Sequence, residues 1–90
     1  MSTLKLISVL ATSLVAGGAY AAANCPSYPK NEWMLQSEAK AKIEGQGYVI
    51  KKFKVDGNCY EIYGTTRDGK RAEVYFDVKT LEVVKAEIGK

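Results

Sequence analysis

The segment DGNCYEIYGTTRDGKRAEVYFD, residues 56–77, decides the fold of this chain. Two of its stretches alternate polar with apolar residues, and a glycine-containing turn signal precedes each of them. Strands joined by such short links are antiparallel neighbours. The segment therefore predicts a β-hairpin whose strands lie within residues 59–66 and 71–78.

The two-residue period of side chains along a strand fixes how these two strands pair. The apolar residues Tyr60, Ile62, Val74 and Phe76 share one face only if paired residue numbers sum to an even number. This excludes a two-residue loop and predicts a three-residue loop, residues 67–69, that ends in a left-handed glycine. Ile62 is then opposite Val74, and Tyr60 is opposite Phe76.

The preceding stretch YVIKKFKV, residues 48–55, predicts a further strand. Its apolar residues have odd numbers and must face even ones, so residues 57–58 are expected to form a two-residue primed turn. Phe53 then faces Ile62. Lys51 interrupts the apolar face, and we expect a bulge or a strand end there.

A fourth strand is expected in LEVVKAEI, residues 81–88, where β-branched residues again dominate. Val83 and Val84 compete for the apolar face of this strand. Its register therefore stays open.

The segment WMLQSEAKAKIEGQG changes to residues that favour helices, with glycines at its end. Leu35, Ala39 and Ile43 recur every four residues on one face. The pattern predicts one helix over residues 34–45, with Ser37 as N-cap if the helix begins late. Such a short helix is unstable alone, so this face is expected to pack on the apolar face of the sheet.

The predicted fold class is α+β, with one N-terminal helix packed on a four-stranded antiparallel β-meander and one disulfide. Residues 24–90 are expected to form a single domain with an irregular arm at residues 24–32, which contains both prolines.

The first 23 residues have the pattern of a secretory signal peptide: a basic start, an apolar run and small residues. Cleavage is expected after Ala23, with Ala21 as the alternative. Lipidation at Cys25 is disfavoured because Asn24 precedes it. The mature chain is therefore expected to be periplasmic or secreted, without a stable membrane anchor.

Export places Cys25 and Cys59 in an oxidising compartment, where two cysteines in a small domain are most simply a structural disulfide. The closed loop is expected to contribute about 3.5 to 4 kcal/mol in the chain-entropy model. A redox role is disfavoured because the chain has no CxxC motif and no histidine. Cys59 has the outward parity, so the bond should draw the arm around the sheet.

Charge and motif spacing exclude several function classes. After cleavage, 12 basic residues oppose 10 acidic ones and alternate with them, whereas nucleic-acid binders cluster their basic groups. A metal site is not expected, since histidine is absent and the acidic residues lack calcium-loop spacing. No cofactor is predicted, and neither phosphate-loop nor nucleophile-elbow spacing occurs.

The sheet face opposite the helix is the candidate binding face. It carries Lys52, Lys54, Glu61, Tyr63, Glu73 and Tyr75. One interpretation is a solvated face with weak ion pairs. The other is a recognition surface, because tyrosines on a rigid sheet are good interface anchors.

Two further residue types on this chain have alternative roles. Glu61 and Glu73 resemble an acid/base pair, but the lysines between them and the absence of a predicted pocket argue against catalysis. No catalytic residue is predicted. Trp33, at the helix entrance, is expected to pack in the core or as a staple rather than serve as a binding platform.

The chain resembles the PepSY domain family, specifically its small secreted bacterial members. The matching elements are the helix ending in GQGY, the hairpin KFKVDGNCYEIYG and the stretch DGKRAEVYFD, and the resemblance covers residues 32–85. The chain departs from the family in DVKTLEVV, where the usual pattern has Pro in place of Val78 and Gly in place of Leu81.

This resemblance implies a non-enzymatic domain of the kind found in protease propeptides and in regulators of cell-wall hydrolases. We therefore expect a protein-binding module that inhibits or regulates a protease or another envelope enzyme. The alternative is a small-ligand or redox accessory protein that serves a membrane electron carrier.

Overall fold

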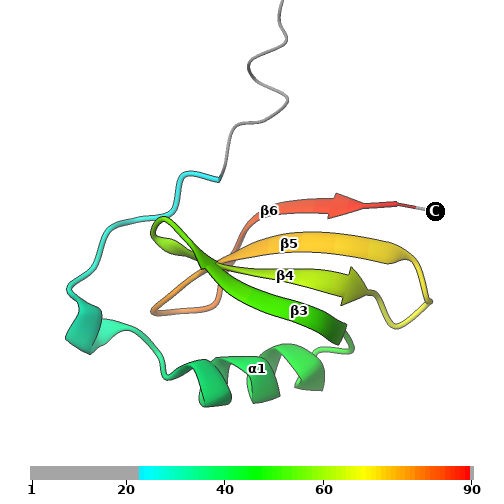
Figure 1. Cartoon of the computed structure of the whole chain (residues 1–90), viewed down its shortest axis with the longest axis horizontal. Helices are drawn as coiled ribbons and strands as arrows, with labels where there is room; N and C mark the ends of the chain where they lie inside the picture. The colour runs from blue at the N-terminus through cyan, green and yellow to red at the C-terminus, as the bar shows by residue number, and fades with distance from the viewer. Residues whose placement is uncertain (1–22, 90) are drawn as a thin grey trace, which may run out of the picture.

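The structure, a computed structural model, describes residues 23–89 and arranges them as one α-helix against a four-stranded sheet (Figure 1). The elements, in chain order, are the 3₁₀ turn η3 (Lys30–Glu32), α1 (Gln36–Gly45), β3 (Val49–Asp56), β4 (Cys59–Thr65), β5 (Arg71–Asp77) and β6 (Val83–Ile88). The α+β prediction is confirmed. The expected signal peptide, residues 1–23, lies outside the described residues except for Ala23.

The sheet is an antiparallel meander in the order β3-β4-β5-β6. Tyr60 is opposite Phe76 and Ile62 is opposite Val74, as the parity of the loop predicts. The turn residues have the expected backbone: Gly57 has a φ of 60° and Gly69 has a φ of 85°. Loop length and strand period therefore determine the register of the hairpin.

A bulge interrupts the pairing of β3 with β4 at Lys51, where it was expected. There the backbone of β3 closes onto Gly64. A Cβ atom on Gly64 would lie 1.8 Å from the carbonyl oxygen of Val49, so only glycine fits at this position.

The strand β6 contains a second bulge, which resolves the competition between Val83 and Val84. Val83 is opposite Phe76 and Lys85 is opposite Tyr75, so Val84 is the extra residue between these pairs. The bulge shifts the alternation of side chains along β6, so a single odd-or-even pattern does not describe which residues of this strand face the core.

The helix begins at Gln36, two residues later than predicted, and Leu35 is its N-cap. The prediction that Leu35 is buried is wrong: its side chain is 70% exposed. The N–H of Met34 donates to the carbonyl of Val78 at 2.9 Å, and the Tyr60 hydroxyl donates to the carbonyl of Met34. These bonds hold the chain extended before the helix and leave Leu35 outside the core. Ser37 is not the N-cap.

The core lies between α1 and the facing side of the sheet. Its buried residues are Ala39, Ile43, Tyr60, Ile62, Ala72, Val74, Phe76, Val78 and Leu81. Phe53, near the edge, is only partly buried, and it packs against the ring of Tyr60 at a centroid distance of 5.1 Å. The two residues at which the chain departs from the family pattern, Val78 and Leu81, are therefore core residues.

The predicted disulfide joins Cys25 to Cys59, with 5.5 Å between their Cα atoms. From this bond the arm continues along the chain to η3 and α1, on the helix side of the sheet (Figure 1). The bond thus fastens the start of the arm to the outer side of β4.

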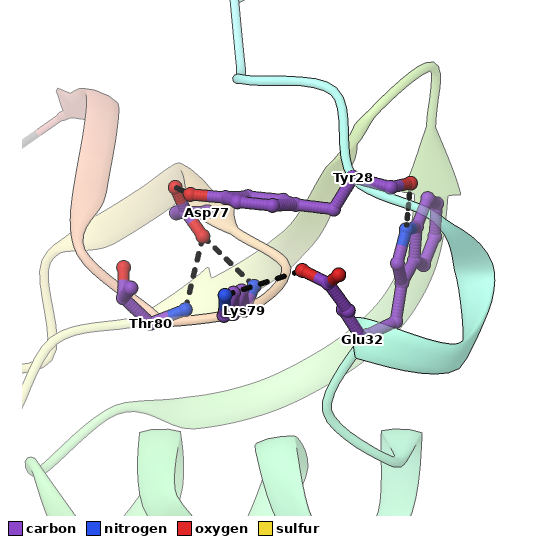
Figure 2. A network of polar contacts seen from close by, with 6 residues as sticks. Tyr28, Glu32, Asp77, Lys79 and Thr80 are labelled. Atoms are coloured by element: carbon purple, nitrogen blue, oxygen red, sulfur yellow. Dashed lines mark hydrogen bonds and ion pairs between the residues drawn. The ribbon is translucent and has the colours of Figure 1, made fainter.

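A polar network fastens the arm a second time, to the turn between β5 and β6 (Figure 2). The Tyr28 hydroxyl donates to Oδ2 of Asp77 at 3.0 Å. Oδ1 of Asp77 accepts the N–H groups of Lys79 and Thr80 at 2.8 and 2.9 Å. The Lys79 ammonium pairs with Glu32 at 3.2 Å, so the arm and the turn are joined at two points.

Candidate functional site

The candidate face is the side of the sheet away from α1, which we call the outer face. Two rows of side chains cross it. One consists of Lys54, Glu61, Tyr75 and Lys85, and the other of Lys52, Tyr63, Glu73 and Glu87. The first three residues of each row are the six predicted from the sequence. Lys85 and Glu87 were missed because the register of β6 was open.

The outer face is not a uniformly solvated surface. Glu61 is 1% exposed and Tyr75 is 7% exposed, so the solvated interpretation is wrong for these two residues. Both lie on the central strands β4 and β5, where neighbouring side chains flank them on two sides. Tyr63, in contrast, is 37% exposed. Of the two predicted tyrosine anchors, Tyr63 is therefore the accessible one.

The Glu61 carboxyl is buried without a hydrogen-bond donor. Among the described residues, neither of its oxygens has a hydrogen-bond partner, and the Lys54 ammonium stands 3.9 Å from Oε1. Burial raises the pKa of Glu61, and the neighbouring Glu73 carboxyl raises it further. No pocket was predicted around these carboxyls from the sequence, and burial on the sheet is the largest cause of the raised pKa of Glu61.

The pKa of Glu73 is shifted in the opposite direction, below its usual value. Its interaction with the Glu61 carboxyl lowers the pKa of Glu73, against the effect of burial. The Tyr75 hydroxyl donates to Oε2 of Glu73 at 3.1 Å and supports the ionised form. The interaction between the two carboxyls therefore displaces their pKa values in opposite directions.

The phenols beside this pair remain neutral at physiological pH. The interaction with Glu61 is the main cause that raises the pKa of Tyr63, and burial is the main cause that raises the pKa of Tyr75. The ammonium groups of Lys52 and Lys54 lie 6.0 and 5.8 Å from the centre of the Tyr63 ring. Tyr63 is thus a neutral aromatic side chain near two ammonium groups of β3.

An open groove continues the outer face from Tyr63 toward the turn that contains Gly69. Its lining includes Lys51, Tyr63, Thr65, Arg71, Glu73 and Glu87. The groove therefore presents charges of both signs around one exposed aromatic ring.

Trp33 has a packing role, as predicted. Its indole N–H donates to the carbonyl of Tyr28 at 3.0 Å, and its ring meets Tyr60 edge to face at 5.7 Å. It lies on the helix side of the sheet and contributes nothing to the outer face.

Within residues 23–89, no helix has the length and apolar character needed to cross a membrane. The same residues contain no group of three or more histidine, cysteine or acidic side chains arranged to hold a metal ion.

Comparison with known proteins identifies one family. The sequence model of the PepSY family described as "Peptidase propeptide and YPEB domain" matches residues 5–87. No curated protein matches the chain significantly, and no solved structure does.

Proposed function

The chain belongs to the PepSY family of peptidase propeptide and YPEB domains, and from this premise we propose that it is a non-catalytic module that binds and restrains a peptidase or another enzyme of the cell envelope. Domains of this family are propeptide-like and inhibitor-like modules in general. Membership of the family supports a peptidase as the bound enzyme. The outer face is the surface proposed to bind it.

The observation that carries the proposed surface is the position of Tyr63. Its ring is exposed, and it stands on a central strand beside two buried neighbours, Glu61 and Tyr75. Lys52 and Lys54 flank the ring from β3. A ring held this way loses little conformational freedom on binding, which is why tyrosines serve as interface anchors.

The compartment proposed for this activity is the periplasm or the exterior of the cell. PepSY domains are typically extracytoplasmic, and the bond between Cys25 and Cys59 fits an oxidising environment. Cleavage after Ala23 is part of the same proposal, because it would release residues 24–90 as the working domain.

The test is capture of partners from an envelope extract of the native host, followed by identification of the proteins recovered. Tyr63→Ala is expected to reduce recovery of the specific partner at least tenfold, since anchor residues at interface centres contribute about 2 kcal/mol or more. The purified partner, if a peptidase, is then assayed with and without the module. Undiminished recovery by the Tyr63→Ala variant would exclude this face.

A matched control is Lys42→Ala, an exposed substitution on the helix side of the molecule. It is expected to leave recovery unchanged. Tyr75→Ala is not a suitable probe, because Tyr75 is buried and its loss would disturb the carboxyl pair beneath the surface.

A further inference from the structure

The strand β6 is an edge of the sheet that α1 does not cover (Figure 1). Val83, Val84 and Ile88 are 49%, 38% and 47% exposed. The opposite edge, β3, has several lysines, a bulge and the helix beside it, all of which hinder pairing with another chain. β6 has a bulge at only one end and is regular from Lys85 to Ile88. It is therefore the edge better suited to receive another strand.

The pairing with β5 determines which backbone N–H and C=O groups of β6 point toward the open edge. The N–H of Gly89 donates to the carbonyl of Arg71 at 2.7 Å, so these two residues form a hydrogen-bonded pair. Hydrogen-bonded and non-hydrogen-bonded pairs alternate along antiparallel strands, so Glu87 and Lys85 also form hydrogen-bonded pairs with β5. The N–H and C=O groups of Ala86 and Ile88 therefore point away from β5. They are directed at the open edge.

We propose that this edge pairs with the same edge of a second copy of the chain, antiparallel and centred on Ala86. In a two-fold arrangement each contact occurs twice. With the axis at Ala86, its outward backbone groups meet those of the second copy's Ala86, and Lys85 lies opposite the second copy's Glu87. Moving the axis by one residue would set Lys85 against Lys85 or Glu87 against Glu87.

Charge complementarity selects the second copy as the occupant and fixes this register. Within one chain Glu87 is opposite Glu73, an unfavourable pair of like charges, and the Lys85 ammonium of the same chain lies 3.4 Å from the Glu87 carboxylate. The second copy's Lys85 would lie on the other side of Glu87 and add a second positive charge beside the two carboxylates, and the two-fold axis repeats this contact at the second copy's Glu87. On the helix side, Val84 would meet the second copy's Ile88, so both exposed apolar residues gain a neighbour.

Pairing of this kind joins the two sheets into one of eight strands, four from each copy. Both outer faces then lie on the same side, and each presents a Tyr63. The inference does not depend on the proposed function, but it would make the binding surface bivalent.

The test is sedimentation equilibrium of the purified protein at concentrations up to about 1 mM, where weak edge pairing is still detected. The wild type is expected to form dimers. Lys85→Glu alone and Glu87→Lys alone are each expected to be monomeric, because each sets like charges opposite one another. An equimolar mixture of the two variants should dimerise, since both cross-strand pairs are again of opposite charge.

Two further variants separate this register from other modes of association. Ala86→Pro removes an N–H that points at the open edge, and it should abolish the dimer while circular dichroism stays that of the folded protein. Lys51→Glu, on the opposite edge, should leave the dimer unchanged. A wild type that stays monomeric, a dimer that survives Ala86→Pro, or a mixture that does not associate would overturn the inference. Pairing of β6 only with a strand of a foreign protein would overturn it also.

Discussion

The hydroxyl of Tyr28 donates a 3.0 Å hydrogen bond to Oδ2 of Asp77 and thereby joins the N-terminal arm to the turn before β6. Asp77 is 3% exposed, and its other oxygen caps the N–H groups of Lys79 and Thr80. One buried carboxylate therefore holds together two segments that are far apart in the chain. The stability of the arm and the geometry of the turn are linked through it.

We predict that Asp77→Ala lowers the free energy of unfolding by about 2 to 3 kcal/mol, the usual contribution of hydrogen bonds to a charged group. Tyr28→Phe, which removes one of these bonds, should cause a smaller loss. Urea denaturation at pH 7 measures both. Glu32→Gln, which breaks only the exposed ion pair with Lys79, is the control and should cost less than about 1 kcal/mol. Equal stability of all four proteins would contradict the prediction.

The contribution of Asp77 should depend on pH. Burial raises the pKa of this carboxyl, but hydrogen bonds from the N–H groups of Thr80 and Lys79 and from Tyr28 outweigh burial and hold the pKa below its usual value. A depressed pKa means that the stabilisation is present above the ordinary aspartate value and is lost as the pH falls through the lowered one. The difference between wild type and Asp77→Ala should therefore shrink below about pH 4.

Glu61 should show the opposite dependence. Because burial raises its pKa, the protonated form is favoured in the folded state, and this stabilisation is lost as the pH rises through the raised pKa. We predict that Glu61→Gln is more stable than wild type at pH 7 and similar to it near pH 4. Thermal denaturation across pH 4 to 8 checks this. Glu44→Gln, an exposed change on α1, should follow the wild-type profile; if it rises equally, burial is not the cause.

Gly64→Ala is predicted to cost more than about 3 kcal/mol, the upper end of ordinary overpacking, since the new methyl group would meet a backbone carbonyl that cannot move alone. Its matched control is Gly45→Ala, where nothing lies within 4 Å of the new Cβ. That change should be neutral or stabilising by up to about 1 kcal/mol. Chemical denaturation of both variants distinguishes a close backbone approach from a general effect of replacing glycine.

Leu81 has a φ of 64°, in the left-handed region, although its side chain is buried in the core. Leu81→Ala should lose about 2 to 5 kcal/mol of packing while the strained backbone remains. Leu81→Gly loses the same side chain but relieves a strain of about 1 kcal/mol, so it should be the more stable of the two. At Ala41, exposed in α1, glycine should instead be the less stable residue. Stability measurements that rank alanine above glycine at both positions would refute this account.

The position of Leu81 also explains where the resemblance to the family weakens. The family pattern has glycine there, which suits a left-handed backbone at no steric cost. In this chain the N–H of Leu81 donates to the carbonyl of Asp77 at 2.9 Å, and the leucine side chain is buried. Leu81 therefore combines a left-handed backbone with a side chain that packs in the core.

Sequence reasoning was most successful where a rule is local. The parity of the loops set the pairing of β3, β4 and β5, because a shift by one residue would move every apolar side chain to the wrong face. It failed at Leu35, whose helical spacing suggested burial, because two hydrogen bonds from distant residues fix the chain just before α1. The register of β6 could not be predicted either, because a bulge interrupts the alternation of side chains on which the prediction depends.

For the candidate face, too, one property was predictable from the sequence and another was not. Alternation along the strands placed Glu61, Tyr63, Glu73 and Tyr75 on one side of the sheet. Which of them are buried was not predictable from alternation, because burial depends on what flanks each position on neighbouring strands and not on its own strand. Burial raises the pKa of Glu61, whereas the interaction with Glu61 lowers the pKa of Glu73 against the effect of burial.

By itself, the sequence determined the α+β class, the three-strand register, the bond between Cys25 and Cys59 and the family, since each depends on residue spacing or on residue type. Only the tertiary structure decided that Glu61 is a buried carboxyl beside Glu73, that Tyr63 is the accessible ring and that β6 has an uncovered edge. The physical reason is that burial and edge exposure are properties of packed neighbours, which the order of residues along one strand does not specify.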